Sequence, residues 1–183
     1  MNIMQFIAPI IYLTLAVFLF WTALSFYNAS KSFAPFVPCK KKELPRIFEV
    51  IGLKNNELFY DLGCGDGRVV FYVAKNFPSK AIGVEMSFLF FLYCWIKRIF
   101  LADKRNITFK LKNLFYEDLS EADAIYVYGM PKVLEKRLRY KLEKELKKGA
   151  RVIAYGFPIK GLEPESIRQP DENHKKSIYL YRF

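Results

Sequence analysis

Three glycines at every second position follow a short strand-like segment of this chain. The segment Tyr60–Arg68 reads YDLGCGDGR, with Asp61 standing before Gly63, Gly65 and Gly67. Glycine has no Cβ, so such a turn adopts positive φ and lets a ligand approach the main chain. The first amides of a helix that follows the turn lack partners inside that helix. The pattern therefore predicts a strand, a tight turn and a helix arranged around a nucleotide-like ligand.

Spacing and charge around this turn distinguish two kinds of ligand. In a dinucleotide fingerprint the third glycine falls three residues after the second, whereas here Gly67 falls two residues after Gly65. Asp61 is a poor neighbour for a pyrophosphate and suits a cation such as S-adenosylmethionine. Glu85, at the end of the next apolar run, can accept both ribose hydroxyls. The set resembles the cofactor motif of the class I, seven-β-strand methyltransferases; the alternative is a tight turn in another α/β protein.

Strand and helix patterns alternate along the rest of the chain. We expect strands at Leu58–Leu62, Lys80–Glu85, Asn106–Lys110, Ala124–Tyr128 and Arg151–Tyr155, and helices at Lys41–Leu53, Arg68–Asn76, Ser87–Leu101 and Lys132–Lys147. This alternation predicts an α/β protein with a Rossmann-like, mostly parallel sheet covered on both sides. Segments Ser166–Gln169 and Ser177–Phe183 predict a terminal antiparallel hairpin, with Asp171–Lys176 as its turn and His174 on the surface.

The first 30 residues contain no charged side chain. As a helix, Ile3–Phe26 would reach roughly 36 Å, which exceeds a hydrocarbon core of about 30 Å. A cleaved signal peptide would have a basic start and a shorter apolar core. We therefore predict a transmembrane anchor over residues 1–30 and a ligand-binding domain over residues 31–183. Because Lys31, Lys40–Lys42 and Arg46 follow the anchor, the positive-inside tendency predicts a single-pass membrane protein with its domain in the cytoplasm.

The net charge of +11 lies mainly in two segments, Lys97–Lys112 and Lys132–Lys148. Beside a bilayer, such charge attracts anionic head groups, and ion pairs within a helix account for part of it. An RNA-binding face is the alternative, but aromatic and basic residues are not interleaved, so no nucleic acid partner is expected. The cysteines lack metal-ligand spacing, so no metal is predicted. The apolar segment Ser87–Leu101 suits either the head-group boundary or a buried position, and both stay open.

The crevice of such a sheet lies at the carboxyl ends of its strands. In the turn and after the second strand, Cys64 and Met86 complete the predicted cofactor site. After the third strand, Asn113 is expected to bind the adenine amino group and Leu114 to cover a face of the ring.

Aromatic residues follow the fourth and fifth strands. Tyr128 and Phe157 are expected to line a channel for a long amine, unless they serve only packing. With a pKa near 10.4, only about one lysine in a thousand is neutral at pH 7.4, so a lysine acceptor would need a site that favours the neutral amine. Asp66 and Tyr128 are candidates to accept a hydrogen bond from it.

The order of several motifs supports a narrower resemblance. The uncharged helix, Pro35-Phe36-Val37-Pro38, the glycine motif, Tyr128-Gly129-Met130-Pro131 and Gly156-Phe157-Pro158 together resemble a small family of membrane-anchored lysine methyltransferases. Eukaryotic members modify the adenine nucleotide translocase and the c subunit of ATP synthase. After Glu85 the family usually continues with Asn-Pro, whereas this chain has Met86-Ser87.

The resemblance implies an enzyme that uses S-adenosylmethionine to methylate lysine in a membrane or membrane-proximal protein. The alternatives are methylation of a lipid or quinone, methylation of RNA, and a catalytically silent membrane scaffold. Asn-Pro-Pro-Tyr, a pattern associated with methylation of amide or exocyclic base nitrogens, is absent after the fourth strand, which disfavours a nucleic acid substrate.

Overall fold

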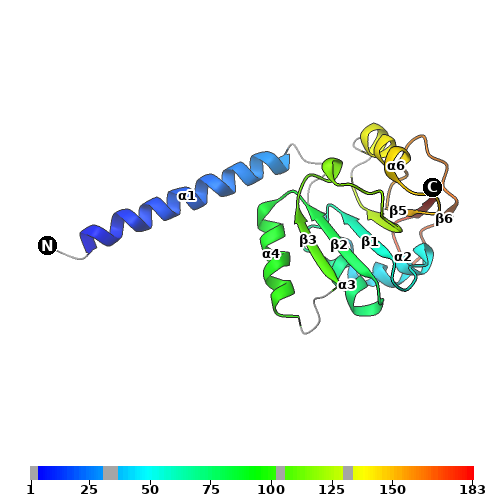
Figure 1. Ribbon diagram of the computed structural model, residues 1–183, viewed down its shortest axis with the longest axis horizontal. Coiled ribbons are helices and arrows are strands. Elements are labelled where there is room, and N and C mark those ends of the chain that lie inside the picture. The colour runs from blue at the N-terminus through cyan, green and yellow to red at the C-terminus, as the bar shows by residue number, and fades with distance from the viewer. Residues whose placement is uncertain (1–3, 31–36, 102–105, 130–133) are drawn as a thin grey trace.

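A computed structural model describes residues 4–30, 37–101, 106–129 and 134–183 (Figure 1). Its centre is a seven-stranded sheet in the order β3-β2-β1-β4-β5-β7-β6. The strands are β1 (Leu58–Leu62), β2 (Lys80–Glu85), β3 (Ile107–Leu111), β4 (Ala124–Val127), β5 (Arg151–Tyr155), β6 (Ser166–Arg168) and β7 (Ile178–Arg182). The first five strands pair in parallel, while β7 pairs antiparallel with β5 and β6. The predicted α/β class and the terminal hairpin are confirmed.

Helices cover both faces of the sheet. On one face lie α2 (Leu44–Ile51) and α3 (Arg68–Asn76), and on the other lie η3 (Leu134–Leu138), a π-helical turn, and α6 (Arg139–Glu145). Since successive strand residues point to opposite faces, Phe59 joins the core under α2 and α3, whereas Tyr60 joins the core under α6. Between β1 and β4 the chain order reverses, which is where open α/β sheets bind ligands.

The predicted boundaries hold to within a few residues, with two informative differences. The segment Lys41–Leu53 begins as the 3-10 turn η1 (Lys41–Glu43), and α2 then ends at Gly52, whose φ of 59° terminates the helix. The strand expected to reach Tyr128 ends at Val127, so Tyr128 lies beyond the sheet. Of the predicted helix Lys132–Lys147, the first two residues lie outside the described part of the chain, as do Pro35, Phe36, Met130 and Pro131.

The helix α1 (Met4–Ser30) projects away from the sheet in Figure 1. Its segment Ile7–Leu24 is long and apolar enough to cross a membrane and is not buried against the rest of the chain. The hydroxyls of Thr14 and Thr22 donate to the carbonyls of Ile11 and Leu19. These two polar groups therefore find partners within the helix, as a lipid environment requires.

The helix α4 (Phe88–Ile99) lies nearest to the carboxyl end of α1 (Figure 1). The rings of Trp21 and Phe88 pack with their centroids 5.2 Å apart. Within α4 only Cys94 is fully buried, so a helix enclosed between the sheet and other helices is not observed. Part of the predicted intrahelical pairing is confirmed on α6, where Arg139–Glu143 and Lys141–Glu145 form ion pairs at 2.9 and 2.6 Å.

Candidate active site

The glycine turn leads from β1 into α3 and is held by backbone hydrogen bonds. The φ angles of Gly63, Gly65 and Gly67 are 81°, 52° and 72°, a region that L side chains rarely adopt. The amides of Gly63 and Cys64 donate to the carbonyl of Val84 at 2.9 and 3.1 Å. The neighbouring strand β2 therefore fixes the shape of the turn.

The outer two glycines meet different surroundings. A Cβ on Gly67 would lie 2.9 Å from the Sγ of Cys94 and within about 3 Å of the Phe71 and Phe109 rings. A Cβ on Gly63 would have no described atom within 4 Å. Gly67 therefore permits close packing of α3 and α4 against the sheet, while Gly63 borders open space beside the main chain, where a ligand can approach.

The carboxylate of Glu85 joins the turn to the end of β2. One oxygen accepts the Gly65 amide at 2.8 Å, and the other accepts the Ser87 amide at 2.7 Å. Each carboxylate oxygen has a second lone pair, so both can accept a further hydrogen bond from a ribose. Met86 is half-buried and directly follows β2 in sequence, between Glu85 and Ser87.

Asp61 is a buried acid with an unsatisfied oxygen. It is 2 % exposed, and its Oδ2 atom has no hydrogen-bond partner among the described residues. Burial, with the charges of Glu85 and Asp66, raises the pKa of Asp61 well above its ordinary 3.8. A ligand with an ammonium group would donate the missing hydrogen bond, and its positive charge would stabilise the ionised carboxylate.

Asn113 and Leu114 follow β3, as expected, at the start of η2 (Leu114–Tyr116). The Oδ1 atom of Asn113 accepts the amide of Phe115 at 3.0 Å, so this side chain caps η2. Leu114 is 5 % exposed and packs in the core under α6. Most of its surface is therefore in the protein core, which leaves little to cover an adenine ring.

The Cys64 side chain fills a tight site, as predicted. A Cβ on Gly83 would lie 2.8 Å from its Sγ atom. A hydrogen bond with Cys94, together with burial, raises the pKa of the Cys64 thiol well above its ordinary range. The thiol therefore packs inside the domain, and only the backbone of Cys64 belongs to the turn that faces a ligand.

Asp66 has a partner within the protein. Its carboxylate accepts hydrogen bonds from the Arg68 side chain at 2.6 to 3.1 Å, and Arg68 also donates to the Cys39 carbonyl at 2.6 Å. Burial alone would raise the pKa of Asp66, but Arg68 outweighs it and holds that pKa below 3.8. An acid held in this way is a weak proton acceptor, and its evident role is to tie the turn to the segment before α2.

Tyr128 and Phe157 lie at the carboxyl ends of β4 and β5, and Tyr155, which the sequence did not single out, joins them. The rings of Tyr128 and Tyr155 meet edge to face, with centroids 5.1 Å apart. The ammonium group of Lys176 lies 4.6 Å from the centroid of the Tyr128 ring, 6.0 Å from that of Tyr155 and 5.7 Å from that of Phe157. We call Tyr128, Tyr155 and Phe157 the aromatic cluster.

Alternation along β5 is the signal that could have found Tyr155, because Ile153 and Tyr155 face the core under α2 while Ala154 faces the other. Lys176 had no comparable signal. It lies 48 residues from Tyr128 in sequence, and the long-range pairing of β5 with β7 brings the two together.

The sheet topology and the residues around the glycine turn together define a class of protein. A sheet with five parallel strands and a closing antiparallel pair carries a glycine turn after β1 and an acid after β2. The orphaned oxygen of Asp61, the open space at Gly63 and the carboxylate of Glu85 fit the cationic amino acid moiety and the ribose of S-adenosylmethionine. The chain is an S-adenosylmethionine-dependent methyltransferase.

Comparison with known proteins identifies the family. The sequence model of the ANTKMT methyltransferase domain matches residues 61–166, and that of the histone methylation protein DOT1 matches residues 26–90. The protein-lysine N-methyltransferase of Saccharolobus islandicus (strain REY15A) is 37 % identical over 157 residues, which cover 80 % of this chain and 92 % of that protein. The chain belongs to the ANTKMT methyltransferase domain family.

Two further matches have different names and extents. The human lysine N-methyltransferase named for the c subunit of ATP synthase is 29 % identical over 133 residues, and the match spans 73 % of this chain and 56 % of the human protein. A solved structure, the RNA methyltransferase from Salinibacter ruber in complex with S-adenosyl-L-homocysteine, has a TM-score of 0.74 and 25 % identity. That match covers 80 % of this chain and 93 % of the other.

Proposed function

We propose that this chain is a membrane-anchored protein-lysine N-methyltransferase, with an anchor over residues 1–30 and a methyltransferase domain over residues 31–183. The aromatic cluster carries the proposal. It lies at the carboxyl ends of β4 and β5, at the same edge of the sheet as the glycine turn, and its ring faces attract an alkyl ammonium group by cation–π interaction. The relatives named as lysine N-methyltransferases support the same acceptor.

The division of work between residues follows from their chemistry. S-adenosylmethionine, when bound, supplies an electrophilic methyl group. Asp61 and Glu85 hold the cationic and ribose parts of the cofactor, while the aromatic cluster excludes water from the acceptor amine and aligns it. Methyl transfer needs a neutral amine in a straight approach, so positioning and desolvation are the main contributions of the protein.

The substrate we propose is a membrane or membrane-proximal protein. Besides α1, the surface of α4 supports this location, because large apolar side chains on and just after α4 are exposed: Leu89, Tyr93, Trp95, Ile96, Ile99 and Phe100. Lys97 and Arg98 lie at its carboxyl end. Such a helix suits the head-group boundary of a bilayer. The basic residues after the anchor favour a cytoplasmic domain.

The test uses the full chain in vesicles, with labelled S-adenosylmethionine and membranes from the source cells. Label in protein, recovered as methyl-lysine after hydrolysis, is the expected result. Label that moves into organic solvent would indicate a lipid or quinone acceptor and contradict the proposal. Absence of cofactor binding in a calorimetric titration would instead indicate a silent scaffold.

A second candidate, RNA methylation, is favoured by two observations. The Salinibacter ruber protein, whose match covers 80 % of this chain, is named an RNA methyltransferase, and the net charge of +11 suits a polyanion. The same experiment separates the two candidates, because label released by ribonuclease identifies RNA as the acceptor.

The anchor is tested by alkaline extraction of membranes that contain the full chain. We expect the wild-type chain to stay in the membrane pellet. A variant with Leu13→Lys and Phe18→Lys should be released, because each charge at the centre of a span costs about 2.5–3.5 kcal/mol on the insertion scale. Equal retention of both proteins would contradict a transmembrane anchor.

A further inference from the structure

The side chain of Lys176 lies inside the aromatic cluster. Its Nζ atom donates a hydrogen bond to the hydroxyl of Tyr128 and lies within 6.0 Å of the centroids of all three rings. A Cβ on Gly156 would lie 3.3 Å from the Cδ of Lys176 and 3.3 Å from the Tyr128 ring. Both the stem and the ammonium group of this lysine are therefore closely surrounded.

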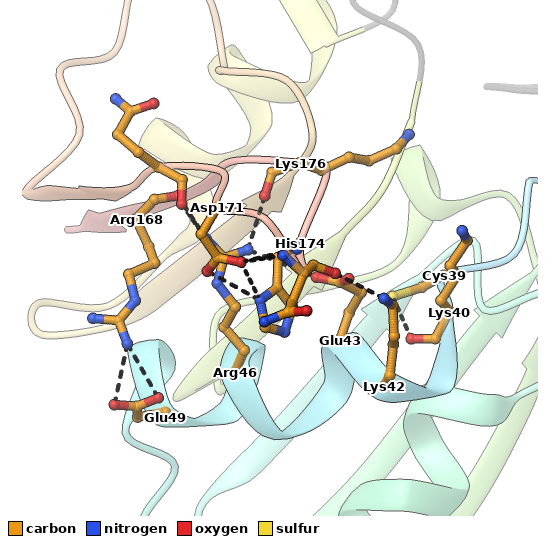
Figure 2. A network of polar contacts seen from close by, with 12 residues as sticks. Cys39, Lys40, Lys42, Glu43, Arg46, Glu49, Arg168, Asp171, His174 and Lys176 are labelled. Carbon is orange, nitrogen blue, oxygen red and sulfur yellow. Dashed lines mark hydrogen bonds and ion pairs between the residues drawn. The ribbon is translucent and has the colours of Figure 1, made fainter.

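The backbone of Lys176 is held in place from the opposite side. Its carbonyl accepts a hydrogen bond from Arg46 at 2.9 Å, and Arg46 also donates to the carbonyl of Gln169. Lys42 donates to the carbonyl of Asn173 at 2.7 Å. In Figure 2 the Lys176 carbonyl faces Arg46, while the side chain extends away from this network. The segment between β6 and β7 is thus fastened to η1 and α2, and it directs Lys176 toward the cluster.

The partners of the Lys176 ammonium group are unusual for a lysine. Among the described residues it forms no ion pair with a carboxylate, and its partners are a phenol hydroxyl and three rings. A carboxylate at this place would stabilise the protonated form of any amine. The rings and the Tyr128 hydroxyl hold the amine by weaker contacts than an ion pair, so an occupant of the cluster can be exchanged. The buried carboxylate of Glu43 interacts with the Tyr155 hydroxyl and forms no ion pair with Lys176 among the described residues.

We propose that the aromatic cluster is the binding site for the acceptor lysine side chain, and that Lys176 is its internal occupant, which an acceptor must displace. This inference rests on the proposed function, because it assumes that the acceptor is a lysine. An internal occupant lowers the apparent affinity for an acceptor by the fraction of time that the site is open. An acceptor lysine is therefore methylated only if it binds the aromatic cluster well enough to displace Lys176.

The first test compares Lys176→Met with Lys175→Met. Methionine keeps an apolar stem but removes the ammonium group, and Lys175 is an exposed neighbour with the same charge. If the site is open about a tenth of the time, KM for a protein acceptor should fall about tenfold in Lys176→Met and stay unchanged in Lys175→Met. We expect kcat to change less than KM. An unchanged or higher KM in Lys176→Met would overturn the inference.

The second test measures occupancy without catalysis. In a short pulse of an amine-acetylating reagent, read by mass spectrometry, Lys176 should react several-fold more slowly than Lys175 in the full chain. Addition of Nα-acetyl-Nε,Nε-dimethyl-lysine amide, which the reagent does not acetylate, should accelerate labelling of Lys176. The norleucine analogue, which lacks the amine, should have no effect. Equal labelling of the two lysines, or no response to the dimethyl-lysine probe, would overturn the inference.

The two tests separate this inference from the proposed function. If methyl-lysine never forms in protein but Lys176 is protected and displaced by the probe, the proposed function fails while the amine site stands. If methyl-lysine forms and Lys176→Met behaves like Lys175→Met, the proposed function stands and the internal occupant is wrong.

Discussion

The glycine turn and the aromatic cluster lie at the same edge of the sheet but keep their geometry by different means. In the turn, backbone amides donate to Val84 and Glu85, and each residue is close in sequence to β1 or β2. In the cluster, side chains from the residue after β4, from the end of β5 and from the segment before β7 meet one another. One region consists mainly of main chain, and the other of side chains from distant segments.

The two regions should therefore differ in how well they tolerate amino-acid substitutions. A backbone site depends on φ angles and close packing, so a single added methyl group disturbs it. A site made of side chains can exchange one ring or one lysine for another while the strands stay in place. Under the proposed function, the turn therefore suits a cofactor that stays the same, and the aromatic cluster suits an acceptor that can differ between related enzymes.

The largest effect is expected from Gly67→Ala. The added Cβ would lie 2.9 Å from the Cys94 Sγ atom, in a residue whose φ is 72°. We expect the free energy of unfolding, measured with urea, to fall by about 2–4 kcal/mol. Gly149→Ala is the matched control, because its φ is 87° but no described atom lies within 4 Å of the added Cβ. It should cost only about 1–2 kcal/mol. Equal losses would show that packing does not constrain the turn.

Because the turn is built from neighbours in sequence, it was predictable. The positions of Asp61, Gly63, Gly65, Gly67 and Glu85 follow from glycine spacing and strand periodicity, and the structure places all five at one sheet edge. The fold followed from the same periodicity. The internal partners of Asp66 and Leu114 did not, since hydrogen bonds and core contacts depend on side-chain directions that a pattern leaves open.

A second effect is expected from Glu85→Gln. Glutamine keeps one acceptor but turns an NH₂ group toward either the Gly65 or the Ser87 amide, which then loses its partner. The loss of charge also weakens the hydrogen bonds that the ribose hydroxyls would donate to this side chain. Hydrogen bonds to a charged group contribute about 1.5–3 kcal/mol, so Kd for S-adenosylhomocysteine in a calorimetric titration should rise about tenfold to a hundredfold. Glu165→Gln, which alters an exposed pair with Arg182 at the sheet edge, should leave Kd unchanged. An unaltered Kd in Glu85→Gln would contradict a role of Glu85 in cofactor binding.

The aromatic cluster was only half predictable. Tyr128 and Phe157 follow predicted strands, so their place at the strand ends could be expected. Lys176 lay in a predicted turn, and nothing local marks it as a neighbour of Tyr128. The antiparallel register that aligns Tyr155 with Ile178 brings them together, and such long-range register is not visible in a local pattern.

A third prediction concerns the affinity for S-adenosylhomocysteine, which should depend on pH through Asp61. The pKa of this buried carboxyl is raised in the free protein, and a bound ammonium group favours its ionised form. S-adenosylhomocysteine, which keeps the ammonium group, should therefore bind best above that raised pKa. Its affinity should fall by up to about tenfold for each pH unit below it. In Asp61→Asn this dependence should disappear, and a wild-type affinity that is flat with pH would contradict the role of Asp61.

The same raised pKa predicts the sign of a stability change without ligand. Between the ordinary value of 3.8 and the raised value, the folded state holds the proton more tightly than the unfolded state. Stability therefore falls as pH rises through this window. Asp61→Asn should unfold at higher urea concentration than the wild type above the window and lose that advantage below it.

The smallest effect is expected in the aromatic cluster, from Tyr155→Leu. Leucine keeps an apolar surface but removes one ring from around the amine, and a cation–π contact contributes about 0.5–2 kcal/mol. KM for a lysine acceptor should rise about two- to thirtyfold, while Kd for S-adenosylhomocysteine stays unchanged. Tyr179→Leu is the control, because Tyr179 packs against the core on the opposite face. The opposite result would be a higher Kd for S-adenosylhomocysteine with an unchanged KM for the lysine acceptor. It would show that a side chain of the aromatic cluster supports the backbone of the glycine turn, so that the two regions are not independent.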